Sequence, residues 1–225
     1  MLLELAVFHR KSVEIARRCG LSRIELCQNY SAGGLSPDTD FFSESRKIFK
    51  ASLFVMIRPR PGNFEYDAGE VHWMESAIKK FDAAGADGFV LGCLKGNAID
   101  AESLEKLVAA AGKKPVTFHR AIDAAADYDL AIEQLIACGC SRMLTSGKEK
   151  SALEGAELIA RSIQKLGSRI GFLAGGGIRS GTAECLLAIQ GLKELHSAAI
   201  LKDGEIADEN EVMKLLESIN RVQPF

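Results

Sequence analysis

The strongest constraint on the fold of this chain is a short apolar run of β type that recurs eight times along 225 residues. The runs begin near residues 2, 23, 52, 88, 115, 141, 169 and 194, and most of the stretches between them have the apolar spacing of a helix. Strands that alternate with helices predict βαβ units and a parallel sheet. Eight such units predict an α/β protein with a (β/α)8 TIM-type barrel, in a single domain over residues 1–225.

Glycines mark the helix ends of this repeat. A glycine stands just past a helical run and shortly before a strand at six places: Gly20, Gly85, Gly112, Gly139, Gly167 and Gly191. A helix commonly closes there with a left-handed residue, which glycine tolerates because it has no Cβ. In the last helix, Asp208 and Glu211 have the spacing of a capping box. A doubly wound open sheet is the alternative fold, but its GxGxxG motif does not follow the first strand.

Charge and apolar patterning narrow the range of partners. Lys and Arg number 28 against 30 Asp and Glu, which leaves no basic excess for nucleic acid. No stretch approaches the ~18 apolar residues of a membrane span, and the first residues lack the pattern of a secretory signal. We therefore expect a cytoplasmic protein with no membrane or nucleic-acid partner. The six cysteines are expected to be free thiols, and Cys138 and Cys140 are interpreted as structural rather than metal-binding.

Ionisable residues fall on one face of several predicted strands. Side chains alternate along a strand, so Glu4 and Ala6 share one face of the first strand, and Glu25 and Cys27 share one face of the second. If these faces point into the barrel, their ionisable groups come together inside it. Arg58 and His119 end two further strands. An unpaired charge is costly to bury, so we expect Glu4, Glu25 and Arg58 to compensate one another. Active sites of such barrels lie at the C-terminal strand ends. We therefore expect Glu25, Arg58 and His119 to form a site, with a purely structural carboxylate–arginine tie as the alternative for Glu4.

Three consecutive glycines connect the seventh predicted strand to the helix that follows. Gly175, Gly176 and Gly177 would let backbone N–H groups approach an anion, and the helix N-terminus would add its positive dipole. Barrels of this kind often bind phosphate at the loops after strands seven and eight. Ser197 after strand eight and Ser146 after strand six would contribute hydroxyl donors. The alternative is a tight turn that needs glycine only for its backbone angles.

These residues favour an enzyme that acts on a small phosphorylated or otherwise anionic metabolite. Glu25 and His119 would exchange protons with the substrate, and Arg58 would oppose a second negative group. Asp123, one helical turn beyond His119, would orient the imidazole. Cys27 would line the pocket or act as a nucleophile. The reaction type stays open, because the same pair serves isomerisation, aldol chemistry or hydrolysis.

Several of these runs together resemble the CutC family, whose members have long been described as copper homeostasis proteins. The matching pieces, in order, are RIELCQNYSAGGLSP, VMIRPRPGNFEY, GADGFVLG, PVTFHRAID, RMLTSG, SALEG, GGGI and ELHSA. The resemblance implies a CutC-type barrel, a cytoplasmic location and assembly into homodimers or higher homo-oligomers. It also implies that the protein binds copper, in the form of Cu(I).

Cys27 is the expected copper ligand, because Cu(I) prefers soft thiolate and thioether donors. Some relatives carry a second cysteine near the end of the first strand, where this chain has Ala6. A two-thiolate site built from the first two strands therefore cannot form, and Cys93, Met56 or His119 would have to complete the coordination. The resemblance therefore favours a copper homeostasis protein that binds Cu(I) through Cys27, and catalysis on a small phosphorylated or anionic metabolite is the alternative that the residues themselves favour.

Overall fold

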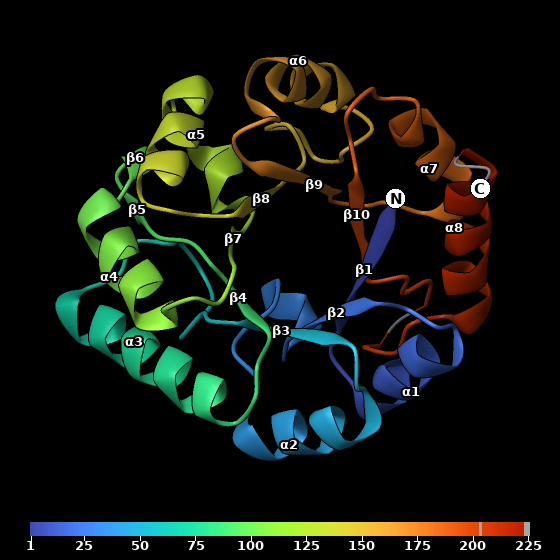
Figure 1. Ribbon diagram of the computed structural model, residues 1–225, viewed down its shortest axis with the longest axis horizontal. Coiled ribbons are helices and arrows are strands. Elements are labelled where there is room, and N and C mark those ends of the chain that lie inside the picture. The colour runs from blue at the N-terminus through green and yellow to red at the C-terminus, as the bar shows by residue number, and fades with distance from the viewer. Residues whose placement is uncertain (203, 223–225) are drawn as a thin grey trace.

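The computed structural model describes residues 1–202 and 204–222, and within them eight parallel strands form a closed barrel ringed by helices (Figure 1). The strands, in their order around the barrel, are β1 (Leu2–Val7), β10 (Glu194–Ser197), β9 (Gly171–Gly175), β8 (Arg142–Thr145), β7 (Val116–Phe118), β4 (Gly88–Leu91), β3 (Ser52–Met56) and β2 (Arg23–Leu26). The barrel closes where β1 pairs with β10, and all eight barrel pairings are parallel. The predicted (β/α)8 fold is confirmed.

Helices follow the strands in alternation and pack around the outside of the barrel (Figure 1). They are α1 (Arg10–Arg18), α2 (Thr39–Ile48), α3 (Ala68–Ala83), α4 (Ala101–Ala111), α5 (Tyr128–Ala137), α6 (Ala156–Leu166), α7 (Ser180–Leu187) and α8 (Glu209–Val222). The sequence did not predict the short antiparallel pair of β5 (Leu94–Lys95) and β6 (Ala98–Ile99), or two 3-10 turns at Tyr30–Ala32 and Arg120–Ala124. None of the described helices is both long and apolar enough to span a membrane.

Aspartate side chains start several of these helices. Asp67 accepts a hydrogen bond from the Glu70 N–H at 2.8 Å, and the Glu70 carboxylate accepts one from the Asp67 N–H at 3.0 Å, so the start of α3 is a complete capping box. Asp38, Asp100 and Asp127 cap α2, α4 and α5 in the same position. At the helix ends, five of the six glycines named above have a positive φ. Gly167 does not: its φ is -66°, so α6 ends in the right-handed region.

The interior of the barrel differs chemically from the layer between strands and helices. Apolar side chains fill that outer layer, for example Leu5 on β1 and Leu53 on β3. Inside the barrel, Arg23 and Arg142 instead approach the ring of Phe54, with their guanidinium carbons 5.4 and 4.3 Å from its centroid. The usual filling of such barrels is branched and apolar. The charged interior therefore has to be neutralised by partners, and those partners lead to the site.

Candidate functional site

A cavity of about 260 Å³ lies at the C-terminal ends of the barrel strands. Among the residues predicted to form a site, its lining contains Glu25, Cys27, Arg58, His119, Gly176, Gly177 and Ser197. Three other predicted residues, Asp123, Ser146 and Gly175, do not belong to the lining. His196 and Arg120, which the sequence did not single out, do belong to it. The volume is below the roughly 300–1,000 Å³ of pockets for drug-sized ligands, so the cavity suits a small metabolite.

His196 lies between two buried carboxylates. Its Nδ1 is 2.9 Å from Glu4 Oε1, and its Nε2 is 3.4 Å from Glu25 Oε2. The three residues come from neighbouring strands, since β1 pairs with both β10 and β2, and Glu4 stands opposite His196 in the β1–β10 register. Barrel closure therefore aligns a carboxylate, an imidazole and a second carboxylate in one row. We refer to Glu4, His196 and Glu25 as the acid–histidine–acid row.

Arginines beneath this row compensate its negative charge. Arg23 Nε lies 2.6 Å from Glu4 Oε2, and the same guanidinium pairs with Glu194. Arg142 reaches Glu194 at 3.4 Å and donates to Thr117 Oγ1 at 2.9 Å. The expected carboxylate–arginine compensation is thus present, but Arg23 provides it. From the sequence we expected Arg58 in that role, because strand alternation predicts the face of the sheet on which Arg58 lies but not where its long side chain ends.

The environment sets the proton affinities of the row. Burial opposes ionisation of Glu4, but the His196 hydrogen bond and the Arg23 charge outweigh it and lower the pKa of Glu4 to about 2. Burial raises the pKa of Glu25 to about 7, against the attraction of His196. Burial also disfavours charge on His196, yet its contacts with Glu4 and Glu25 raise its pKa above the usual value. Glu25, with a pKa of about 7, can therefore change its protonation state near neutral pH, while the carboxylates of Glu4 and Glu25 favour the charged form of His196.

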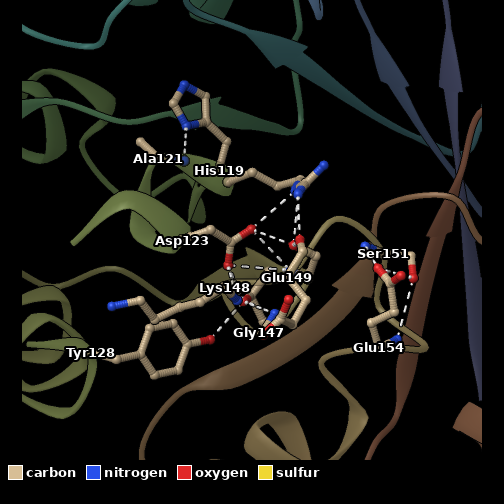
Figure 2. A network of polar contacts seen from close by, with 12 residues as sticks. His119, Ala121, Asp123, Tyr128, Gly147, Lys148, Glu149, Ser151 and Glu154 are labelled. Atoms are coloured by element: carbon tan, nitrogen blue, oxygen red, sulfur yellow. Dashed lines mark hydrogen bonds and ion pairs between the residues drawn. The ribbon is translucent and has the colours of Figure 1, made fainter. Parts of the chain in front are cut away.

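His119 has a different character from His196. Its Nδ1 accepts a hydrogen bond from the Ala121 N–H at 3.2 Å (Figure 2), which places the imidazole proton on Nε2. Burial, assisted by the Arg58 charge, lowers the pKa of His119 to about 3. The ring packs against Phe64 with a centroid separation of 4.8 Å. Near neutral pH His119 is a neutral donor, which does not fit the acid/base role expected for it.

Arg58 uses both terminal nitrogens of its guanidinium to bind the protein's own backbone. Its NH1 donates to Ala32 O at 2.9 Å and Gly34 O at 3.1 Å, and its NH2 donates to Gly62 O at 3.0 Å. The guanidinium also covers the Phe64 ring at 4.8 Å. Arg58 therefore holds together the loops that follow β2 and β3. Arg58 also lines the cavity, and its Nε has no hydrogen-bond partner among the described residues, so a contact with a negative group of the substrate stays a prediction.

Asp123 is the centre of a separate polar network (Figure 2). Its Oδ1 accepts from Thr145 Oγ1 at 2.6 Å, and its Oδ2 accepts from the backbone N–H of Ser146 at 3.0 Å and from Arg120 Nε at 3.0 Å. The Ser146 hydroxyl lies in this network too, 2.9 Å from Asp123 Oδ2. Among the described residues Asp123 makes no contact with the His119 imidazole, so the expected orienting role was wrong. The 3-10 turn after β7 directs Asp123 away from that ring.

The glycine loop adopts the backbone that only glycine accepts readily. Gly176 and Gly177 have φ values of 108° and 70° and line the cavity. Within residues 1–202 and 204–222, the backbone N–H groups of both have no hydrogen-bond partner. Gly175 is instead the last residue of β9, where a Cβ would lie 3.1 Å from His196 Cβ. Two of the three predicted anion-binding glycines thus have N–H groups available to a ligand.

The other expected donors around this loop are already engaged. The Ser197 hydroxyl donates to Ile178 O at 2.8 Å. At the N-terminus of α7, the Ser180 N–H and hydroxyl donate to the two Glu211 carboxylate oxygens at 2.6 and 2.8 Å. Glu211 therefore occupies the helix end that was expected to attract a bound anion. The predicted capping box is only half formed: Asp208 Oδ1 accepts from the Glu211 N–H at 3.0 Å, but the Asp208 N–H donates to Ala199 O at 2.8 Å instead of to the Glu211 carboxylate.

Cys27 is fully buried beside Glu25 at the end of β2. Burial and the adjacent Glu25 carboxylate raise the pKa of its thiol well above the ordinary value. The second soft atom nearby belongs to Met56: a Cβ built on Gly34 would lie 3.6 Å from both Cys27 Sγ and Met56 Cε. Ala6 also lines the cavity, where some relatives have a thiol. The soft donor set is one protonated thiol and one thioether.

The fold and the cavity define the class: a (β/α)8-barrel protein with a buried acid–histidine–acid row at the C-terminal end of its barrel. The CutC family model matches residues 1–201, and the chain belongs to the CutC family. A CutC family protein of Xanthomonas campestris pv. campestris (strain B100) is 40% identical over 200 residues, covering 88% of this chain and 83% of the relative. One of Pasteurella multocida (strain Pm70) is 39% identical over 197 residues, covering 87% and 81%.

A solved structure supports the same assignment. CutC from Streptococcus agalactiae, described as a candidate copper homeostasis protein, superposes with a TM-score of 0.83 at 30% identity. The match covers 88% of this chain and 98% of that one. The predicted membership of the CutC family is confirmed.

Two residues of the site escaped the reasoning from sequence, for different reasons. His196 shares the inner face of β10 with Glu194, and this alternation was a signal that pointed inward. Arg120 directly follows His119, and its direction depends on the 3-10 turn, for which the sequence offered no clear signal.

Proposed function

We propose that this chain is an enzyme that moves a proton on a small anionic metabolite, with Glu25 and His196 as the reacting pair. The observation that carries the proposal is the placement of His196 between Glu4 and Glu25 in the wall of a metabolite-sized cavity. Perturbed proton affinities in a cleft favour a catalytic role over a structural tie. Glu25 has the pKa of a base that works near neutral pH.

The step follows from the two protonation states. Ionised Glu25 takes a proton from a substrate C–H or O–H bond, and the bonding electron pair stays on the substrate. Where that bond is a C–H next to a carbonyl, the pair moves to the carbonyl oxygen, which receives a proton from His196 Nε2. Glu4 does not touch the substrate: it is a positioning residue that holds His196 Nδ1 and stabilises its charged form. Glu25 Oε1 has no hydrogen-bond partner in the described structure, which leaves it free to accept the substrate proton.

The same three side chains also suit a bound cation in principle. One ligand atom from each lies within 4.8 Å of the others. However, Glu4 is already paired with Arg23 at 2.6 Å, so the arginine supplies positive charge beside the row. That charge favours a shared proton over a second cation.

Hydrogen–deuterium exchange tests the proposal. The protein is incubated in D₂O with small sugar phosphates and oxo acids, and deuterium incorporation at carbon is followed by NMR. We expect exchange in the wild type, its loss in Glu25→Gln and His196→Gln, and no change in Glu105→Gln, an exposed carboxylate on α4. Metabolites that bind without exchanging, or exchange that survives both replacements, would contradict proton transfer by this pair.

Cu(I) binding is the second candidate, and the adjacent Cys27 and Met56 side chains favour it. Thioether and thiolate sulfurs are the donors that Cu(I) prefers, and the related Streptococcus agalactiae protein is described as a candidate copper homeostasis protein. The thiol must lose its proton to bind, against burial and the neighbouring Glu25 carboxylate. This requirement makes copper the weaker fit.

An anaerobic Cu(I) titration against a competing chelator tests this second candidate. Tight one-to-one binding that disappears in Cys27→Ser and weakens in Met56→Leu would establish it. Cu(I) binding that is unchanged in Cys27→Ser would contradict a copper site at Cys27. Cys185→Ser is the matched control, because this thiol is exposed.

We further propose that the chain forms one domain and works in the cytoplasm as a homodimer or larger homo-oligomer. The resemblance to the CutC family supports this expectation, and the balanced charge supports the absence of a nucleic-acid partner. Limited proteolysis, cell fractionation and sedimentation equilibrium test the three parts separately.

A further inference from the structure

We propose that Arg120, together with the backbone N–H groups of Gly176 and Gly177, binds a phosphate group of the substrate. This inference rests on the proposed function and narrows its substrate class to small phosphate monoesters. The site adjoins the acid–histidine–acid row, and no residue is shared between the two.

Arg120 is held rigidly, with one nitrogen left over. Its Nε donates to Asp123 Oδ2 at 3.0 Å, and its NH2 donates to Ser146 Oγ at 2.6 Å and Glu149 O at 3.3 Å. Its NH1 has no hydrogen-bond partner in the described part of the chain. The side chain is 42% exposed and lines the cavity. Asp123 and Ser146 thus acquire a role: they position the arginine so that little conformational entropy is lost when it binds a ligand.

The free face of Arg120 lies against the glycine loop. A Cβ on Gly176 would stand 3.3 Å from both Cζ and NH1 of Arg120, so the bare backbone is what lets the guanidinium approach. The unpartnered N–H groups of Gly176 and Gly177 lie in the same loop. A guanidinium combined with successive backbone N–H groups provides charge and several donors, which suits the oxygens of a phosphate.

Other candidate cations near the loop are already used. Arg179 donates to Ile178 O and Ile200 O, each at 2.8 Å. The α7 N-terminus holds Glu211. Arg120 therefore carries the positive charge that selects an anion here.

The loop also fixes the distance between phosphate and reacting atom. Gly175, next to Gly176, would place a Cβ 3.1 Å from His196 Cβ. The anion site and the proton-transfer pair are thus adjacent across the ends of the paired strands β9 and β10. In a cavity of about 260 Å³, a substrate that fills both has one phosphate and a short carbon chain.

Isothermal titration calorimetry with inorganic phosphate and with glycerol phosphate tests the site. A parallel titration with acetate shows whether a carboxylate binds equally well. We expect millimolar or tighter binding of the phosphates and a loss of at least about tenfold in affinity in Arg120→Met, because charge-assisted hydrogen bonds are removed. Arg17→Met is the matched control: it removes an exposed arginine on α1 and should leave affinity unchanged. Arg120→Lys, which keeps the charge without the fork, should retain part of the affinity and covers the case in which Arg120→Met does not fold.

Glu25→Gln separates this inference from the proposed function. It should bind phosphate like the wild type while losing deuterium exchange. If the wild type and the variants bind phosphate but none of them catalyses deuterium exchange, the proposed proton transfer would be contradicted and the proposed phosphate site would be supported. Affinity that is unchanged in both Arg120 variants, or acetate binding as tight as phosphate, would overturn the anion site.

Discussion

At the residue scale, the barrel controls the charge of Glu25 through its surroundings. The side chain is buried at the end of β2, and its only nearby cationic partner in the row is His196, whose Nε2 lies 3.4 Å away. Glu4, by contrast, has Arg23 as well as His196. Two carboxylates on neighbouring strands therefore acquire pKa values of about 7 and about 2. This separation gives the two acids different roles, one that exchanges a proton and one that stays charged.

Protein stability should report the state of Glu25. Folding raises its pKa from 4.5 to about 7, so the folded state binds more protons between those values and the free energy of unfolding falls as pH rises through them. Glu25→Gln mimics the protonated form and should remove this loss, on the order of 3 kcal/mol between pH 5 and 8. Denaturant unfolding at both pH values measures it. If the free energies of unfolding of the wild type and Glu25→Gln differ by the same amount at pH 5 and pH 8, the raised pKa of Glu25 would be contradicted.

Single residues also show what the sequence could and could not predict. Strand alternation correctly placed Glu25 and Cys27 at the cavity, because parity decides which face a side chain takes. It could not say where long or loop-borne side chains end. The guanidinium of Arg58 reaches backbone carbonyls of two loops, and Asp123 turns toward Ser146, because these directions depend on loop conformations with no periodic signal.

At the element scale, α7 and α8 are joined through Glu211. Its carboxylate accepts two hydrogen bonds from Ser180 at the start of α7, although it belongs to the first turn of α8. Strand and helix positions were predictable because periods of two and 3.6 are local properties. A cap supplied by another helix is not local. This is why the sequence placed Glu211 in a capping box of its own helix.

Loss of this cap should destabilise the C-terminal part of the barrel. Glu211→Ala removes the acceptor for two donors at the α7 N-terminus, which costs about 1–2 kcal/mol. Glu217→Ala, an exposed position on the same helix, should change the free energy of unfolding by less than ~0.5 kcal/mol. Thermal unfolding followed by circular dichroism compares the two. Equal effects would mean that the Ser180 contacts contribute nothing.

At the scale of the whole molecule, charges connect strands across the barrel interior. Arg23 on β2 pairs with Glu4 on β1 and Glu194 on β10, and Arg142 on β8 pairs with the same Glu194. Glu4 and both arginines are buried and Glu194 is partly buried, so salt screens these ion pairs less than exposed ones. The barrel is therefore held together from inside by a network in which each member compensates another.

Removal of one member should weaken the entire barrel. Arg23→Met leaves Glu4 and Glu194 without their shared cation, which we expect to cost about 3–5 kcal/mol of unfolding free energy. Arg18→Met breaks an exposed pair with Glu209, 2.8 Å apart, and should cost less than about 1 kcal/mol. Urea unfolding of both variants makes the comparison. A cost for Arg23→Met no larger than that of Arg18→Met would show that the interior network is not a source of stability.

The meeting of β1 and β10 has a consequence for biosynthesis. Glu4 and His196 are 192 positions apart, so at roughly 5–20 residues per second a ribosome needs about 10–40 s to add the second partner after the first. For most of that time Glu4 and Glu25 are both present, but the imidazole that completes the row has not been made. A nascent or prematurely released chain therefore lacks the proposed proton-transfer pair, and the acid–histidine–acid row forms only when the barrel closes.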